Sequence, residues 1–183
     1  VWSVGPKPNA ENKLVLVQPN GQIAWQYTKL RPTPGPEKAN SIPGDGKMHV
    51  LQTPYGRIGS FICFDGDFWQ IAAKAGARKA ALILDPAGDW RAIDPWHTQM
   101  ASFRALEQGF NLVRATSKGL SAAYDYQGRR LAAVDYFNTS DYAMISEVPT
   151  AGVRTFYGVA GNWFAWLCVA ALIALLARAY ATA

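Results

Sequence analysis

One cysteine of this chain is placed where a nucleophile would be delivered to a reactant. Cys63 closes the short apolar run of residues 56–62 and is followed at once by an acid and a glycine. This pattern predicts a buried strand that ends in a tight turn, with a helix beginning at about Phe68. A thiol at such a turn is exposed on one side, and neighbouring backbone N–H groups can stabilise an oxyanion. The alternative is a structural cysteine, because free cysteines are among the most buried residues of proteins.

The remaining cysteine and the two histidines indicate no metal centre. His49 and His97 are far apart, and Cys168 lies inside an apolar terminal run, so no disulfide and no metal-ligand spacing is evident. We therefore expect neither a metal nor a cofactor. A Cys63–His97 dyad is an alternative mechanism, but His97 follows a proline near the start of a predicted helix, where capping or surface exposure explains it better.

Short strands and two helices must position these residues. Asn20-Gly21 between two apolar runs predicts a hairpin, and the four prolines of residues 31–46 predict a long, stiff loop. Asp89 and Trp90 belong to a predicted loop over residues 85–90. We expect helices at about 68–75, ending at Gly76, and at 95–108. Besides the strand leading to Cys63, we expect strands at residues 14–17, 23–27, 49–52, 80–84, 111–115, 121–126, 130–134 and 142–148.

The order of these elements predicts an α/β fold in which two sheets are sandwiched between helix layers. The chain has 183 residues, half of them apolar, so one domain with a sizeable core is expected and disorder is excluded. The net charge of +5 comes from scattered basic residues and forms no stripe. We therefore expect no nucleic-acid partner, whereas attraction to an anionic membrane surface suits a mild positive excess.

A second strong signal is the apolar C-terminal run. Residues 163–177 carry no charge, and aromatic residues flank the run on both sides. A bilayer span needs about 20 mostly apolar residues, and a helix that is apolar on all faces fits a membrane better than a soluble surface. We expect a domain at residues 1–150, a linker at 151–162 and a transmembrane helix at 163–182. The alternative is a buried C-terminal helix.

The two ends of the chain suggest a larger protein and an orientation. The chain has no initiator Met and opens in the middle of a pattern, so we expect it to be a piece of something longer. Arg178, just after the uncharged run of residues 163–177, favours a cytoplasmic C-terminus and therefore a domain on the outer face of the membrane.

Several segments, taken together and in order, resemble the nitrilase (carbon–nitrogen hydrolase) superfamily over roughly residues 1–148. Residues 27–37 are similar to its lysine segment and residues 53–65 to its cysteine segment. Gly88-Asp89-Trp90, His97, residues 100–107 and residues 112–116 with Gly119 follow its downstream pattern. The amino-acid sequences of these segments, together with the apolar run after the domain, are most similar to the membrane-bound branch, the apolipoprotein N-acyltransferases.

The resemblance implies a four-layer αββα sandwich with a Glu-Lys-Cys triad. Cys63 would be the nucleophile, and Lys29 would stabilise the tetrahedral oxyanion together with the backbone N–H of Phe64. Glu37 would match a second glutamate that orients the site, and Asp89 and Trp90 would contact substrate. A buried ammonium beside the thiol is expected to lower the pKa of Cys63. Taken alone, Lys29 reads as a solvated lysine at a strand end, and Glu37 as a plain loop carboxylate.

Two departures from the family pattern bear on activity. The general-base glutamate belongs upstream of the lysine, in a segment that this sequence does not include. Glu11 is the only acid before Lys29, and its turn-like setting does not identify it as the base. Asp65 stands where an acyltransferase more often has glutamate, which leaves another nitrilase branch open.

Three functions therefore remain in competition. The first is transfer of a fatty acyl group from a phospholipid, through a cysteine thioester, to the N-terminal amine of a lipoprotein at the bacterial inner membrane, with the catalytic domain on the periplasmic face. The second is a membrane-tethered amidase or nitrilase that hydrolyses a carbon–nitrogen bond. The third is a non-catalytic module that keeps the fold. The terminal span favours the first, because a lipid donor requires a site at the bilayer.

Overall fold

The computed structural model describes residues 2–182 and contains two β-sheets. The smaller sheet is an antiparallel meander of β1 (Trp2–Val4), β2 (Glu11–Val17) and β3 (Ile23–Thr28). The β2–β3 turn contains Gly21, whose φ of 82° is a left-handed conformation that glycine adopts without strain. The hairpin predicted from Asn20-Gly21 is therefore confirmed, and it delivers Lys29 directly after β3.

The larger sheet has six strands in sequential order. They are β4 (Val50–Thr53), β5 (Gly56–Ser60), β6 (Leu82–Gly88), β7 (Asn111–Ser117), β8 (Leu120–Tyr124) and β9 (Arg130–Asp135). β5, β6 and β7 run parallel, and the outer pairs are antiparallel. Because parallel strands end at one edge of a sheet, the residues that follow β5 and β6 meet there. That edge carries Cys63 and Asp89.

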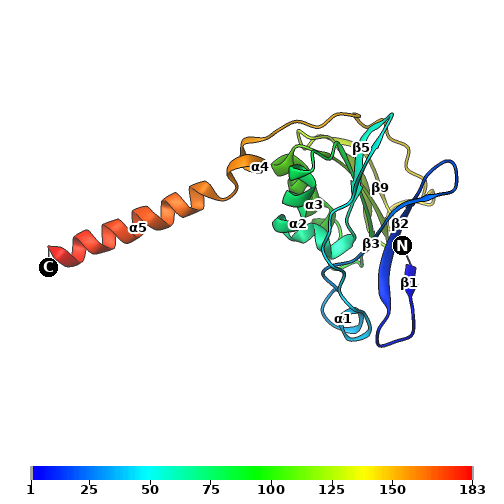
Figure 1. Cartoon of the computed structure of the whole chain (residues 1–183), viewed down its shortest axis with the longest axis horizontal. Coiled ribbons are helices and arrows are strands. Elements are labelled where there is room, and N and C mark those ends of the chain that lie inside the picture. Colours follow the sequence, from blue (N-terminus) through cyan, green and yellow to red (C-terminus); the bar gives the residue numbers. More distant parts are fainter. Residues whose placement is uncertain (1, 183) are drawn as a thin grey trace.

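Two helices cover one face of this sheet, and the three-stranded sheet lies on the other side (Figure 1). The 3₁₀ turn η1 (Cys63–Asp67) leads into α2 (Trp69–Ala77), and α3 (Trp96–Gln108) follows β6. Small residues let the helices approach the sheet closely, and the core between them contains Phe61, Ile83, Phe110 and Leu112. The predicted α/β fold with two sheets is confirmed, and α2 and α3 form the helix layer of the described residues.

Four local predictions differ from the structure. The long proline-rich loop contains a short helix, α1 (Pro36–Asn40), and β6 continues through the predicted loop as far as Gly88. Residues 142–148 pair with no strand in the described part of the chain. Their local pattern is typical of a strand, but a strand also needs a neighbouring strand to pair with, and the local pattern carries no information about that partner. α2 continues past Gly76, where a Cβ would lie 2.4 Å from Gln108 Oε1, so this glycine permits close helix packing rather than ending the helix.

The chain leaves the domain through a hydrogen-bonded segment. Asn111 Nδ2 donates to the carbonyls of Pro149 and Ala151, and the Val153 N–H donates to the Gly109 carbonyl. α4 (Phe156–Ala160) follows, with Thr155 as its N-cap.

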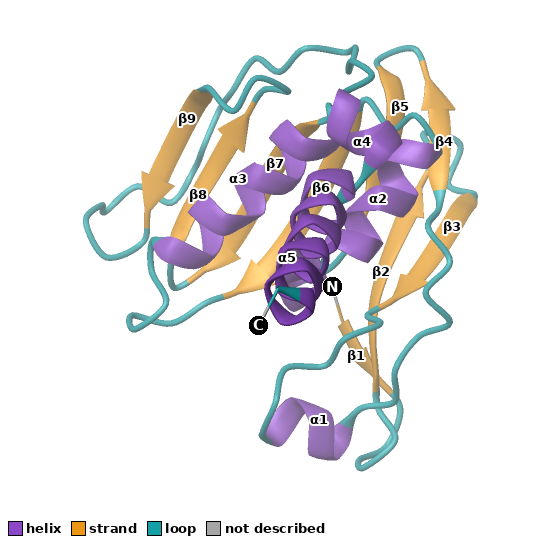
Figure 2. Cartoon of the chain, turned by 90° about the vertical axis from the view of Figure 1, so that its left-hand side faces the viewer, coloured by secondary structure: helices purple, strands orange, loops and turns teal. Residues whose placement is uncertain are grey.

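The last helix, α5 (Trp163–Ala181), projects away from the domain on the side of α2 and α3 (Figures 1 and 2). It has 19 residues and a mean hydropathy of 2.0, and none of its residues is buried. By length and composition, α5 could cross a membrane, and it is not the buried core helix considered as the alternative.

Candidate active site

Cys63 stands at the sharp turn that the sequence predicts. It is the first residue of η1, and its φ of 52° is a left-handed conformation that a non-glycine residue adopts at a cost. Its N–H donates to Asp85 Oδ1 at 2.7 Å, which ties the turn to β6, and its Sγ lies 3.9 Å from the Gly88 carbonyl oxygen. The backbone therefore holds the thiol at the carboxyl edge of the sheet.

Lys29 is buried and paired, not solvated. Only 2% of its surface is exposed, and its Nζ lies 2.9 and 2.7 Å from the two carboxylate oxygens of Glu37. Glu37 belongs to α1 and also accepts hydrogen bonds from the Thr33 N–H and Asn12 Nδ2. Burial opposes ionisation of Glu37, but these hydrogen bonds outweigh it and lower its pKa to about 2. The proline-rich loop thus provides a fixed carboxylate that holds the lysine.

Asp65 connects the lysine segment to the cysteine turn. Its buried carboxylate accepts from Tyr27 Oη at 2.7 Å and from the Arg31 N–H at 2.8 Å. Burial raises the pKa of Asp65 even though these hydrogen bonds oppose the shift. One side chain therefore fixes η1 against the residues on both sides of Lys29.

Two cavities of different character meet at Cys63. The first has a volume of about 470 Å³ and contains polar groups of Lys29, Glu37 and Asn12. The second has a volume of about 300 Å³ and is largely apolar. Its walls are Phe64, Trp90, Ala92, Ile93, Trp96 and Met100, together with Asp67 and His97. Cys63 and Thr33 line both cavities. A reactant bound at the thiol can therefore place an apolar part on one side and a polar part on the other.

The thiol pKa differs from the expectation. Burial raises the pKa of Cys63, and the nearby Lys29 charge lowers it by less, so the net shift is upward. The neighbouring ammonium therefore acts in the expected direction, but burial outweighs it and the thiol pKa is not low. The thiol needs a base to become a nucleophile. Glu37 is a poor candidate, because a carboxylate with a pKa of about 2 is too weak a base to take the proton of this thiol.

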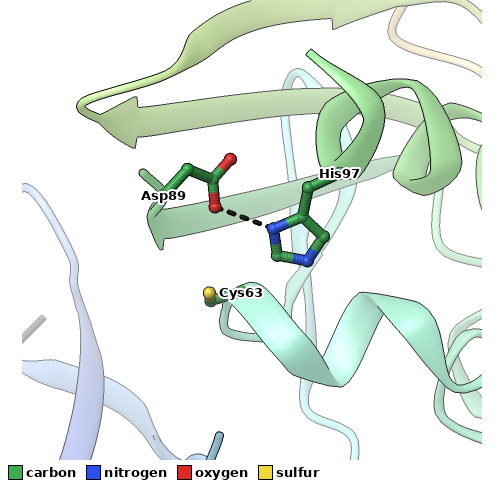
Figure 3. A group of neighbouring side chains, drawn as sticks. All are labelled: Cys63, Asp89 and His97. Atoms are coloured by element: carbon green, nitrogen blue, oxygen red, sulfur yellow. Dashed lines mark hydrogen bonds and ion pairs between the residues drawn. The ribbon is translucent and has the colours of Figure 1, made fainter. Parts of the chain in front are cut away.

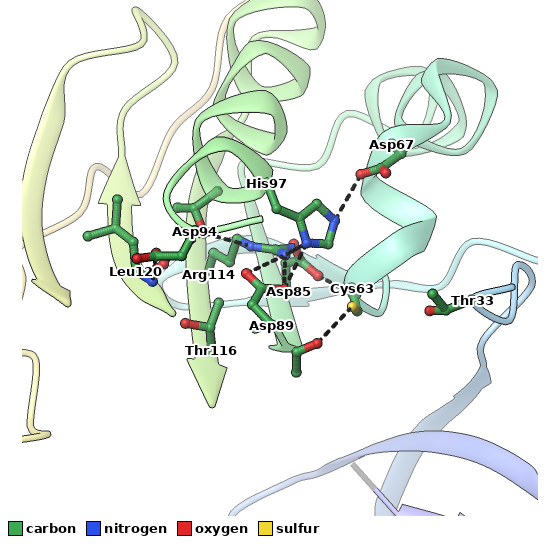
Figure 4. A network of polar contacts seen from close by, with 12 residues as sticks. Thr33, Cys63, Asp67, Asp85, Asp89, Asp94, His97, Arg114, Thr116 and Leu120 are labelled. Atoms are coloured by element: carbon green, nitrogen blue, oxygen red, sulfur yellow. Dashed lines mark hydrogen bonds and ion pairs between the residues drawn. The ribbon is translucent and has the colours of Figure 1, made fainter. Parts of the chain in front are cut away.

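Behind the thiol lies a buried network of charges (Figure 4). Arg114 is fully buried in β7 and donates to Asp85 and to both carboxylate oxygens of Asp89. Burial raises the pKa of Asp85 to about 6 despite the pairing with Arg114. Asp85 also accepts a hydrogen bond from the Cys63 N–H, so the Asp85–Arg114 ion pair helps to fix the turn that carries Cys63.

His97 belongs to this network, so the expectation that it caps a helix or is surface-exposed is wrong. It is 8% exposed, its Nδ1 lies 2.7 Å from Asp89 Oδ1, and its Nε2 lies 3.0 Å from Asp67 Oδ1. Burial disfavours the imidazolium, but the hydrogen bonds to Asp67 and Asp89 outweigh it and raise the pKa of His97 to about 9. A histidine held as a cation is no base for the thiol, and no hydrogen bond joins it to Cys63 in the described residues (Figure 3).

The fold gathers three potential metal ligands that are far apart in the sequence. Ligand atoms of Cys63, Asp89 and His97 all lie within 4.8 Å of one another (Figure 3). The Arg114 guanidinium, however, lies 2.8 Å from His97 Nδ1 and 3.1 Å from Asp89 Oδ1. A fixed cation already neutralises these donors, so the group is better suited to holding protons than to binding a metal.

The structure brings most of the predicted site residues together. Cys63, Lys29 and Glu37 line the polar cavity, Phe64 and Trp90 line the apolar one, and Asp89 instead contacts His97 and Arg114. Sequence reasoning missed Thr33 and the residues Asp67, Asp85 and Arg114. The one signal in the sequence that could have identified any of them is a charged residue within an apolar strand, namely Asp85 in β6 and Arg114 in β7.

The amino-acid sequence matches a known family over most of its length. The family described as carbon-nitrogen hydrolase matches residues 2–156. A protein of Geobacter metallireducens named apolipoprotein N-acyltransferase is 32% identical over 92% of this chain and 36% of its own length. One of the same name from Gloeobacter violaceus is 34% identical over 69% of this chain and 25% of its own length. The chain thus spans about a third or less of these relatives.

Two solved amidase structures have the same fold. An amidase from Nesterenkonia sp. superposes with a TM-score of 0.70 at 21% identity, covering 85% of this chain and 62% of its own. A mutant of the Nesterenkonia sp. AN1 amidase, with acetamide covalently added at its active-site cysteine, has a TM-score of 0.69 at 21% identity and covers 78% of this chain and 57% of its own. At this identity the likeness extends to the fold alone.

Proposed function

Since the chain belongs to the carbon-nitrogen hydrolase family, we propose that it carries the nucleophile of an N-acyltransferase. The enzyme moves a fatty acyl group from a phospholipid to Cys63, and from Cys63 to the N-terminal amine of a lipoprotein. The relatives named apolipoprotein N-acyltransferase support this choice of donor and acceptor.

One observation carries the proposal: Cys63 lies where an apolar and a polar cavity meet. An acyl chain fits the cavity walled by Phe64, Trp90 and Ile93, which leaves the ester carbonyl at the thiol and the head group on the polar side. The apolar α5 on the same molecule is consistent with a donor drawn from a bilayer. A hydrolase of small polar amides, even a membrane-tethered one, would have no use for the apolar cavity.

The chemistry proceeds in two balanced steps. In the first, a base takes the Cys63 proton, the thiolate attacks the ester carbonyl, and the lysophospholipid alcohol leaves with that proton, so a thioester has replaced an ester. In the second, the lipoprotein amine attacks the thioester, loses one proton and releases the thiol, so an amide has replaced the thioester. The family resemblance assigns the base to a glutamate upstream of Lys29. Glu11 does not line the cavity and is paired with Lys13.

In both steps a negative charge develops on the carbonyl oxygen. Lys29 presents a buried ammonium beside Cys63 and would stabilise that oxygen, with the Phe64 N–H as a second donor. Glu37 acts through Lys29, because its two hydrogen bonds keep the ammonium in place before substrate arrives. Asp89 and Trp90 belong to the loop that closes the apolar side of the site.

The test is a transfer assay on the full-length protein that contains this chain. Vesicles of a phospholipid with a labelled acyl chain are the donor, and the acceptor is a lipopeptide with a free N-terminal amine. We expect labelled amide on this lipopeptide and none on its N-acetylated twin, which lacks the nucleophilic amine.

The competing functions predict different products in the same assay. Labelled fatty acid without any labelled amide would favour the membrane-tethered amidase or nitrilase, in which water is the acceptor. Absence of both products and of a thioester on Cys63 would favour a non-catalytic module.

We further propose that α5 spans the bacterial inner membrane, with the domain on the periplasmic face. Arg178 after the apolar run favours a cytoplasmic C-terminus. We expect residues 156–183, fused behind a soluble reporter, to integrate into membranes. Leu172→Arg should reduce integration strongly, because an arginine at the centre of a span costs about 2.5–3.5 kcal/mol. Tyr180→Arg, near the end of the helix, is the matched control and should have little effect. Equal integration of the two variants would contradict the span.

A further inference from the structure

His97 joins two walls of the apolar cavity that come from different parts of the chain. Its Nε2 contacts Asp67 at the end of η1, the turn that begins with the nucleophile. Its Nδ1 contacts Asp89, which directly precedes Trp90 in the loop after β6. Asp67, Trp90, His97 and Cys63 all line the same cavity. The imidazole thus bridges Asp67 and Asp89, as the dashed lines at His97 show in part (Figures 3 and 4).

The surrounding charges explain why His97 contacts both Asp67 and Asp89. The groups that face His97 are Asp67 and Cys63 from η1, Asp85 from β6, Asp89 from the loop after it, and Arg114 from β7. Three carboxylates surround two cations, so the doubly protonated imidazole is favoured and both ring nitrogens donate. Arg114 lies 2.8 Å from Nδ1 and disfavours the second proton, but the two carboxylates in direct contact outweigh it.

We propose that His97 is a positioning residue that holds the nucleophile turn and the Trp90 loop at a fixed separation, so that the apolar cavity accepts an acyl chain beside Cys63. His97 does not contact the reacting atoms and exchanges no proton with them. The identity of the chain as an acyl group rests on the proposed function. The bridge itself concerns the shape of the cavity and can be tested without turnover.

The test measures the selectivity of Cys63 for reagents with and without an alkyl chain. The reagents are iodoacetamide and its N-octyl derivative, and the readout is the ratio of their alkylation rates at Cys63 in the full-length protein. We expect this ratio to favour the octyl reagent in the unmodified protein. It should fall about tenfold in both His97→Asn and His97→Gln. The asparagine amide reaches the position of Nδ1 and keeps only the Asp89 contact, whereas the glutamine amide reaches that of Nε2 and keeps only the Asp67 contact.

His49→Gln is the matched control. His49 stacks on Trp25, with ring centroids 6.1 Å apart, and does not line the apolar cavity. It should leave the ratio unchanged. If the His97 variants fail to fold, Asp67→Ala breaks one half of the bridge at a partly exposed side chain, and it should lower the ratio in the same direction.

The pH dependence separates a bridge from a mere structural role. His97 is charged in the folded protein up to a pH of about 9, so the selectivity ratio should decline as the pH rises through that value. Ionisation of the thiol speeds both reagents alike and cancels in the ratio. In His97→Gln the ratio should be low at every pH.

The outcomes for the bridge and for the transferase are distinguishable. A ratio that is equal in the unmodified protein and both folded His97 variants would overturn the bridge, whatever the transfer assay gives. A lowered ratio together with failed acyl transfer would leave the bridge standing and refute the proposed function alone.

Discussion

Cys63→Ala is expected to abolish the covalent thioester that forms when the full-length protein meets a labelled phospholipid. Cys63 is the cysteine at the strand-end turn, and of the two cysteines it is the one that lines both cavities, so we expect no other thiol to take its place. The measurement is retention of label on the denatured protein and its release by hydroxylamine, which cleaves thioesters.

Cys168→Ala provides the matched control. Cys168 is exposed on α5 and remote from Lys29 and Glu37 in the sequence, so labelling should be unchanged. Label that survives Cys63→Ala and disappears with Cys168→Ala would reverse the assignment of the nucleophile.

Lys29→Met should lower the rate of thioester formation by a factor of roughly a hundred or more, the typical effect of losing one oxyanion donor. Methionine keeps much of the apolar stem but removes the ammonium from the cavity. The carboxylate of Glu37 keeps its hydrogen bonds to the Thr33 N–H and Asn12 Nδ2, so the loop retains two of its anchors. The measurement is a single-turnover rate with the labelled donor.

Two further variants separate the charge of Lys29 from its structural effects. Lys13→Met removes a paired lysine of β2, whose Nζ lies 2.6 Å from Glu11 Oε2 and outside the cavity, and it should leave the rate near normal. The double variant Lys29→Met, Glu37→Gln also removes the unpaired carboxylate. If its rate returned to normal, the single variant's loss would come from a buried unpaired acid, and the oxyanion role of Lys29 would be refuted.

The local sequence pattern was sufficient to predict the turn at Cys63, the β2–β3 hairpin and the helix α5. An apolar run ending in an acid and a glycine predicted the turn at Cys63, and Asn20-Gly21 predicted the hairpin that positions Lys29. Uniform apolarity over residues 163–177 predicted the isolated helix α5. In each case the signal lies within a few residues of the feature, because turn conformation and hydrophobic burial are decided by neighbours in the chain.

The family resemblance contributed what no local pattern contains. It associated Lys29 and Glu37 with Cys63 across a proline-rich loop, and the structure brings these three side chains to one cavity. Taken alone, Lys29 and Glu37 read as an ordinary strand-end lysine and a loop carboxylate. Their chemical roles remain predictions that the variants above test.

Only the tertiary structure decided the state of the charges around the nucleophile. His97 read as a surface or capping residue because nothing in its sequence neighbourhood shows that Asp67 and Asp89 converge on it from other elements. Lys29 lowers the pKa of Cys63 as expected, but burial outweighs this effect and the net shift is upward. Protonation depends on burial and on charges brought together by folding, and these distances are absent from the linear sequence. The sequence by itself therefore determined which groups can react, while the tertiary structure decided which of them hold a proton.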